Sequence, residues 1–241
     1  MSLTPTTAMV LAAGLGTRMR PLTDDRPKPL IKVAGKALID WTLDRFAAAG
    51  VERAVVNVHY FADMMEAHLK TRTRPAIAVS DERAQLLETG GGLKRARALL
   101  GDGPVFCANT DAILLDGPGA EPCAGLAEAF DPARMDALLL LVPIEAASGY
   151  DGRGDFELSA AGRLAGRHGE RAPYVFTGFQ IISLDLLDGA PEGPFSTRLL
   201  WDRAAAKGRF MGVVHDGAWM HVGDPQGLDE AERRLSEGMR R

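Results

Sequence analysis

Three charged residues in this chain have the types and settings that phosphate chemistry needs: Arg18, Lys28 and Asp111. Arg18 ends the sequence Gly-Leu-Gly-Thr-Arg, whose glycines leave main-chain N–H groups accessible to an anion such as phosphate. Lys28 has proline on both sides, which fixes two φ angles and holds the cation on a stiff loop. Asp111 supplies a carboxylate of the kind that binds a hard divalent cation. The pattern indicates a site for a phosphate-bearing ligand.

The glycine-rich loop matches neither of two common phosphate-binding patterns. A dinucleotide-binding loop needs a third glycine where Met19 stands, and a Walker loop needs Gly-Lys-Ser/Thr, which the sequence lacks. A simple turn after a strand would explain Gly14 and Gly16. It would not explain Arg18 or the Pro-Lys-Pro sequence, so we interpret the loop as a binding site.

Strands and helices alternate along the chain and must position these residues. The apolar run Val10 to Ala13 lacks helical spacing and predicts a strand buried on both faces. Further strands are predicted at 54–58, 76–79, 104–108, 137–142, 174–184 and 210–214, and helices at 38–49, 62–69, 93–100, 195–206 and 227–235. The alternation predicts an α/β fold, a Rossmann-like, mostly parallel mixed sheet with flanking helices and a small β excursion at 149–169.

Polar residues and glycines follow several of these strands. Ligands of parallel sheets bind beyond the carboxyl ends of the strands, where Gly14, Asn57, Ser80 and Asn109 are expected to emerge. Asp111 lies two residues after Asn109, so its carboxylate is expected within reach of the glycine-rich loop. An isolated aspartate at this position could instead cap a helix or a turn.

Composition sets limits on the partners and the compartment. The net charge is −4 with both signs interspersed, so no broad basic field favours nucleic acid or an anionic membrane. No apolar run reaches membrane-spanning length, and residues 1–7 do not resemble a signal peptide. Cys107 and Cys123 are too few for a disulfide framework and are expected to stay reduced in a cytoplasmic protein. With 241 residues, 46% of them hydrophobic, a single domain over 1–241 is expected.

Two motifs in the first thirty residues resemble a known signature. Leu11-Ala-Ala-Gly-x-Gly-Thr-Arg-Met-x-Pro-Leu-Thr23, followed by Pro27-Lys-Pro-Leu30, is similar to that of the sugar-1-phosphate nucleotidyltransferases. The resemblance extends from about Ala8 to Gly227. It implies transfer of a nucleotide to a sugar 1-phosphate, with about 1–110 as the nucleotide-binding half and about 111–241 as the sugar-phosphate-binding half.

The resemblance also implies roles for individual residues. Arg18 and Lys28 would be catalytic, the first stabilising the pyrophosphate leaving group and the second contacting phosphate near the reacting centre. Residues 87–92, Leu-Glu-Thr-Gly-Gly-Gly, resemble the family's second nucleotide-binding segment, and three glycines before a helix favour close approach by a flat ligand. An N-cap at Thr89 in a flexible turn is the alternative. The implied nucleotide-binding residues are Leu11, Ala12, Ala13, Gly14, Gly16, Thr17, Gln85, Glu88, Thr89, Gly90 and Asn109.

The second half carries motifs for the sugar. Residues 152–156 and 176–179 resemble segments of bacterial N-acetylmuramate-1-phosphate uridylyltransferases and related hexose-1-phosphate enzymes. They would form a wall against the sugar, and an ordinary hairpin is the alternative. The implied sugar-phosphate-binding residues are Asp155, Thr177, Gly178 and His221.

The metal position departs from the family pattern. Asp111 matches the family's metal-binding aspartate and implies Mg²⁺, but His221 stands where the family usually has a second one. Imidazole is a poorer ligand for Mg²⁺ than a carboxylate is. His221 could bind the metal, contact a water or a phosphate, or pack as a core histidine beside Trp219. Asp224 could supply a replacement carboxylate.

The expected partners are a nucleoside triphosphate, with UTP favoured, and a hexose 1-phosphate, with N-acetylmuramate 1-phosphate favoured. The protein is expected to use Mg²⁺ and to be a monomer or a small homo-oligomer. Two alternatives stay open. One is a regulatory pseudoenzyme that binds nucleotide sugars, which the altered metal position favours, and the other is a guanylyltransferase or cytidylyltransferase of the same superfamily.

Overall fold

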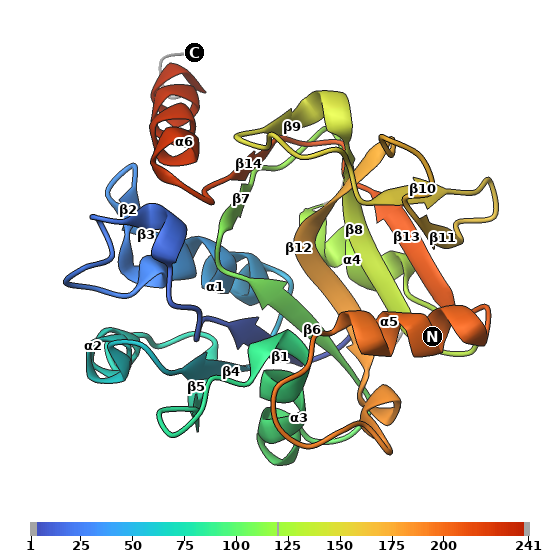
Figure 1. Cartoon of the computed structure of the whole chain (residues 1–241), viewed down its shortest axis with the longest axis horizontal. Helices are drawn as coiled ribbons and strands as arrows, with labels where there is room; N and C mark the ends of the chain where they lie inside the picture. The colour runs from blue at the N-terminus through green and yellow to red at the C-terminus, as the bar shows by residue number, and fades with distance from the viewer. Residues whose placement is uncertain (1–3, 120, 239–241) are drawn as a thin grey trace.

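The computed structural model describes residues 4–119 and 121–238, which form one large mixed sheet with helices around it (Figure 1). The strands of this sheet are β1 (Thr7–Leu11), β4 (Arg53–Val58), β5 (Ala76–Asp81), β6 (Pro104–Asn109), β8 (Ala137–Pro143), β10 (Phe156–Leu158), β11 (Leu164–Gly166), β12 (Tyr174–Ser183) and β13 (Phe210–Val214). Their order is β11-β10-β12-β6-β1-β4-β5, with β8 beside β12 and β13 beside β8. β1, β4, β5 and β6 pair in parallel, and β12 runs antiparallel to β6 and β8. The predicted α/β fold with a mostly parallel mixed sheet is confirmed.

Helices cover both faces of the sheet because its strands carry apolar side chains on both sides. In β1, Ala8 and Val10 belong to the apolar cluster that contains Phe46, whereas Met9 belongs to the cluster that contains Leu93. The first cluster includes residues of α1 (Leu38–Ala48), α2 (Ala62–Leu69) and α4 (Pro122–Ala129), and the second includes residues of α3 (Glu88–Leu100) and α5 (Arg198–Ala206). Two apolar layers therefore fix the carboxyl ends of the parallel strands.

A third apolar cluster anchors the segment between β1 and α1. It joins Met19 to Ile113, Met220 and Leu235. The elements outside the main sheet are β7 (Ala112–Leu114), β14 (Trp219–His221) and β9 (Ala147–Ser148) in a small sheet, the hairpin of β2 (Lys32–Val33) and β3 (Lys36–Ala37), the helix α6 (Pro225–Gly238), and the 3₁₀ helices η1 (Thr17–Met19), η2 (Lys28–Leu30), η3 (Ile144–Ala146) and η4 (Leu184–Leu187). Since Met19 follows Arg18 directly, its burial holds the loop that carries this cation.

The differences from the predicted elements lie mainly next to the site. β1 ends at Leu11, so Ala12 and Ala13 belong to the loop. α3 begins at Glu88 and not at Leu93, so the prediction that the three glycines precede the helix is wrong. The predicted β excursion is the antiparallel hairpin of β10 and β11, whereas β7 and α4 were not predicted. No helix in the described part of the chain has the length and apolar composition that crossing a membrane requires.

Candidate active site

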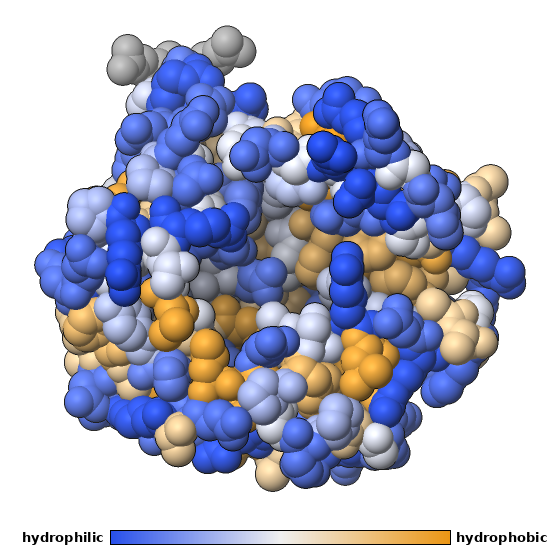
Figure 2. Space-filling model, viewed as in Figure 1, coloured by the Kyte–Doolittle hydropathy of each residue, from blue (hydrophilic) through white to orange (hydrophobic). Residues whose placement is uncertain are grey.

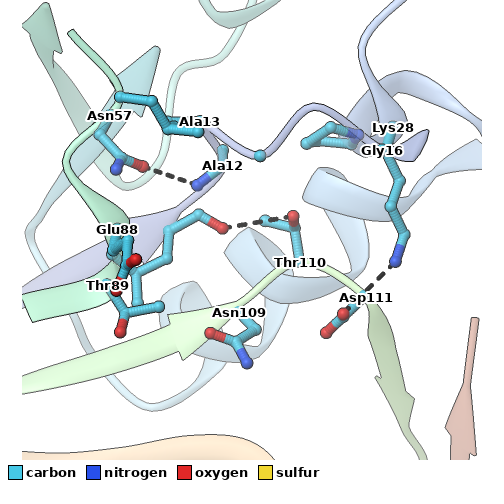
Figure 3. Close-up of a pocket in the computed structure, with 14 residues that line it drawn as sticks. Ala12, Ala13, Gly16, Lys28, Asn57, Glu88, Thr89, Asn109, Thr110 and Asp111 are labelled. Atoms are coloured by element: carbon cyan, nitrogen blue, oxygen red, sulfur yellow. Dashed lines mark hydrogen bonds and ion pairs between the residues drawn. The ribbon is translucent and has the colours of Figure 1, made fainter. Parts of the chain in front are cut away.

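A cavity of about 290 Å³ opens beyond the carboxyl ends of β1 and β6 (Figure 3), and Figure 2 shows the molecule hollowed near the centre of the same view as Figure 1. The predicted residues that line the cavity are Leu11, Ala12, Ala13, Gly14, Gly16, Lys28, Glu88, Thr89, Asn109 and Asp111. Thr17, Arg18, Gln85 and Gly90 are not among the lining residues; the first three are exposed and Gly90 is buried. Pro29, Asn57, Leu86 and Thr110 also line it.

Gly14 and Gly16 of the glycine-rich loop are needed for different physical reasons. Gly16 has φ of 64°, and a Cβ there would lie 3.0 Å from atoms of both Lys28 and Thr23. The Thr23 hydroxyl donates to Gly16 O at 2.9 Å, which closes the loop on itself. A Cβ on Gly14 would meet no protein atom within 4 Å. Packing therefore explains Gly16, whereas the open space beside Gly14 is available to a ligand.

Lys28 and Asp111 form the charged end of the cavity. Lys28 Nζ lies 3.3 Å from Asp111 Oδ2, and only 12% of the lysine side chain and 27% of the aspartate side chain are exposed. Burial lowers the pKa of Lys28, although the charge of Asp111 opposes this shift. Burial alone would raise the pKa of Asp111, but the charge of Lys28, with smaller effects of His221 and Arg18, brings it below its ordinary value. An ionised carboxylate beside cations suits a divalent cation and phosphate oxygens.

A buried hydrogen-bond network centred on Asn57 lies at the end of the cavity opposite Lys28 and Asp111. Asn57 Oδ1 accepts from Ala12 N at 2.6 Å, and Asn57 Nδ2 donates to Glu82 Oε1 at 2.8 Å. Burial raises the pKa of Glu82, although its hydrogen bond from Asn57 opposes the shift. A Cβ at Gly92 would lie 2.8 Å from both Asn57 Nδ2 and Glu82 Oε1, so the network needs a glycine there. Sequence reasoning missed the role of Glu82, because it attributed Gly92 to close approach by a flat ligand and not to packing against this pair.

The first turn of α3 is held by the second half of the chain. Phe195 O accepts from Gly90 N at 2.8 Å and from Gly91 N at 3.0 Å, and Thr89 Oγ1 accepts from Thr197 N at 2.9 Å. A Cβ on Gly90 would lie 2.5 Å from the Phe195 ring, and one on Gly91 would overlap a main-chain oxygen. Close packing by protein atoms therefore accounts for these glycines without a flat ligand. The same bonds explain why the helix begins at residue 88.

A smaller cavity of about 90 Å³ adjoins the first, and the two share Asn109 and Asp111. Of the predicted sugar-side residues, Thr177, Gly178 and His221 line it and Asp155 does not. Asp155 Oδ2 accepts from the main-chain N–H of residue 176 at 3.0 Å, and the buried Thr177 hydroxyl donates to the main-chain oxygen of residue 140 at 2.9 Å. Both side chains therefore shape the wall of the cavity through contacts within the protein.

His221 lies in a group of aromatic rings beside Asp111. Its ring centroid is 5.8 Å from that of Trp219, with the planes 20° apart, and 6.5 Å from that of Tyr150. A Cβ at Gly223 would overlap the imidazole Nε2. Burial lowers the pKa of His221, although the charge of Asp111 opposes the shift, so the neutral imidazole dominates at neutral pH.

The described residues do not form a complete protein cage for a metal. They contain no group of three or more His, Cys, Asp or Glu side chains arranged to hold an ion. Asp224 Oδ1 accepts from Gly227 N at 2.8 Å and so caps the start of α6. Asp111 is a single carboxylate at the cavity, which fits a cation such as Mg²⁺ that takes one or two carboxylates and completes its shell with water and substrate phosphates.

Comparison with known proteins identifies the family. A family model described as "Nucleotidyl transferase" matches residues 7–151, which include the glycine-rich loop, Lys28 and Asp111. The chain belongs to the nucleotidyl transferase family. The family and the kind of enzyme that residues 11–30 predict are thereby confirmed.

Several known proteins are similar to this nucleotidyl transferase over nearly its whole length. It is 56% identical to the N-acetylmuramate alpha-1-phosphate uridylyltransferase of Caulobacter vibrioides, over 98% of this chain and 100% of that protein. It is 35% identical to the protein of the same name from Neisseria meningitidis serogroup B, over 93% and 96% respectively. A solved UDP-glucose pyrophosphorylase complexed with UDP-glucose superposes with a TM-score of 0.79 at 15% identity, over 96% of this chain and 98% of that one. The last comparison confirms the fold.

Proposed function

We propose that this nucleotidyl transferase joins UTP and N-acetylmuramate 1-phosphate to give the UDP sugar and pyrophosphate. The observation that carries the proposal is the junction of the two cavities, where Asn109 and Asp111 line both and Lys28 pairs with Asp111. Residues up to about 110 would bind the nucleotide, and the rest would bind the sugar phosphate. The names of the two bacterial relatives supply the substrates.

The proposed chemistry needs no general base. A phosphate oxygen of the sugar phosphate is already anionic at neutral pH and attacks the α-phosphorus of UTP. The new O–Pα bond forms as the bond from Pα to the bridging oxygen of pyrophosphate breaks, and pyrophosphate leaves with that electron pair. Lys28 would neutralise charge on the reacting phosphates, and Arg18 would neutralise charge on the leaving group. Positioning and charge stabilisation would supply most of the rate enhancement.

Asp111 is the residue that would hold Mg²⁺ in this site. The ion would offset the charge of the triphosphate when bound. The neutral His221 would contact a water or a phosphate oxygen and would not replace the family's second aspartate as a direct ligand. Reduced Cys107 and Cys123 are consistent with action in the cytoplasm.

Pyrophosphate release tests the proposal directly. Each of four nucleoside triphosphates is mixed with N-acetylmuramate 1-phosphate, N-acetylglucosamine 1-phosphate or mannose 1-phosphate in the presence of Mg²⁺. We expect the highest kcat/KM for UTP with N-acetylmuramate 1-phosphate. Turnover of GTP with mannose 1-phosphate, and none with UTP, would refute the proposal.

A further inference from the structure

Glu82 is a carboxylate buried behind the cavity, and the proposed reaction gives it no task. It follows β5 directly, is only 2% exposed and does not line the cavity. Burying an ionisable group costs free energy that an apolar side chain of similar size would not cost. The hydrogen bond from Asn57 offsets this burial most, followed by the hydrogen bond from Leu87. These two bonds are therefore what Glu82 contributes to the structure.

The Glu82 carboxylate joins two segments of the chain through its two oxygens. Oε1 accepts from Asn57 Nδ2 at 2.8 Å, and Oε2 accepts from Leu87 N at 3.4 Å. Because its Nδ2 is bound in this way, the Asn57 amide turns its Oδ1 toward Ala12 N and accepts from it at 2.6 Å. A carboxylate supplies two acceptors and no donor, whereas an amide in its place would supply one of each. With Asn57 as its neighbour, only a carboxylate at residue 82 satisfies all three donors.

Both ends of this series of hydrogen bonds lie at the cavity. Ala12 is the first residue of the glycine-rich loop after β1, and Ala12 and Asn57 line the cavity (Figure 3). At the other end, Leu87 directly precedes α3, and its neighbours on both sides line the cavity. Glu82 therefore connects two walls of the cavity from behind, without reaching a ligand itself.

We propose that Glu82 is a positioning residue, which holds the glycine-rich loop and the residues before α3 in the arrangement that binds a nucleoside triphosphate. The inference rests on the proposed function, in which UTP occupies this cavity. Without the carboxylate, the Asn57 amide can turn over and present its Nδ2 to Ala12 N, which displaces the start of the loop. When a ligand binds only one of several arrangements, its apparent affinity falls with the population of that arrangement. The loss would therefore appear in the affinity for UTP.

Glu82→Gln tests the proposal through the Kd for UTP, measured without a sugar phosphate, and through kcat and KM for UTP. In every orientation of the new amide and of the Asn57 amide, one donor faces another donor. We expect the Kd and the KM for UTP to rise about 10- to 100-fold, the factor for one hydrogen bond to a charged group. At saturating UTP, kcat should change less than about threefold, because Glu82 does not line the cavity in which the phosphates react.

Asn57→Asp combined with Glu82→Gln is the second variant, because it restores each hydrogen bond with the carboxylate and the amide exchanged. The carboxylate at residue 57 would accept from Ala12 N and from the new amide, whose oxygen would accept from Leu87 N. This double variant should recover most of the lost UTP affinity. Asn57→Asp alone sets two carboxylates against each other and should bind UTP at least as weakly as Glu82→Gln does. The pair is thus tested by a double-mutant cycle.

Asp136→Asn is the matched control. The Asp136 side chain is 14% exposed and pairs with Lys207 and Arg209, and none of these residues lines the cavity. The control should leave the Kd for UTP unchanged, even where it lowers the melting temperature.

An unchanged Kd in Glu82→Gln overturns the inference, whether or not the melting temperature falls, since Glu82 would then only stabilise the fold. A double variant that binds UTP no better than Glu82→Gln also overturns it. A wild-type protein that binds UTP but turns over no sugar phosphate overturns the proposed function, while the Kd still tests Glu82. A wild type that does not bind UTP overturns both.

Discussion

Replacing Lys28 with alanine removes the cation proposed to act at the reacting phosphates. A unit charge 4 Å from another is worth about 4 kcal/mol at an effective dielectric constant of about 20. Lys28 Nζ lies at a comparable 3.3 Å from Asp111 Oδ2, so a phosphate oxygen beside Asp111 would be within similar reach. This interaction raises kcat only to the extent that it is stronger in the transition state than in the enzyme–substrate complex. Removal of one transition-state donor lowers kcat by about 10² to 10³, and we expect that loss for Lys28→Ala.

The assay is steady-state pyrophosphate release at saturating UTP and sugar phosphate, together with thermal melting. Lys32→Ala is the control, because Lys32 is an exposed lysine on β2 that does not line the cavity. The control should keep the kcat of the wild type. A Lys28→Ala variant with normal kcat and normal melting would show that Lys28 serves only as the partner of Asp111.

Experiments at three other residues, two at the site and one in the core, give further predictions. His221→Ala should raise the Mg²⁺ or substrate concentration needed for half-maximal rate, and His221→Asp should retain or raise Mg²⁺-dependent activity; equal dependence in wild type and alanine variant would mean that His221 only packs. Gly92→Ala should lower the free energy of unfolding by about 1–3 kcal/mol in denaturant titration, because its Cβ would overlap the Asn57–Glu82 pair; an unchanged midpoint would contradict this. Cys107 should not react with a thiol reagent at pH 8 until the protein unfolds, because burial raises its pKa to about 12; rapid labelling of the native protein would disprove it.

The sequence closely predicted the bounds of those helices and strands whose ends depend on residues nearby in the chain. The helix at 62–69 and the strand at 210–214 have the predicted bounds, and α1 ends one residue before its predicted end, with Gly50 following. The meeting of the glycine-rich loop and Asp111 at one cavity was also predictable, because ligands of parallel sheets bind beyond the carboxyl ends of the strands and both segments follow such strands.

Features set by contacts distant in sequence were not predictable in this way. The N–H of Ala12 is donated to the side chain of Asn57 and not to a neighbouring strand, so β1 ends earlier than its apolar run. The start of α3 depends on the carbonyl of Phe195, which no local pattern near residue 88 can indicate. The left-handed backbone of Glu88 belongs to this same turn.

The contact between Phe195 and the first turn of α3 bears on how this chain can be divided into fragments. A cut near residue 110 would follow the proposed functional halves, yet it would remove the acceptor of the Gly90 and Gly91 N–H groups. It would also strip β12 from β6 and leave a long strand edge open to pairing with other chains. We therefore expect an isolated fragment 1–110 to lose the observed conformation of the first turn of α3 and to aggregate. A split version of this protein would need both pieces present during folding.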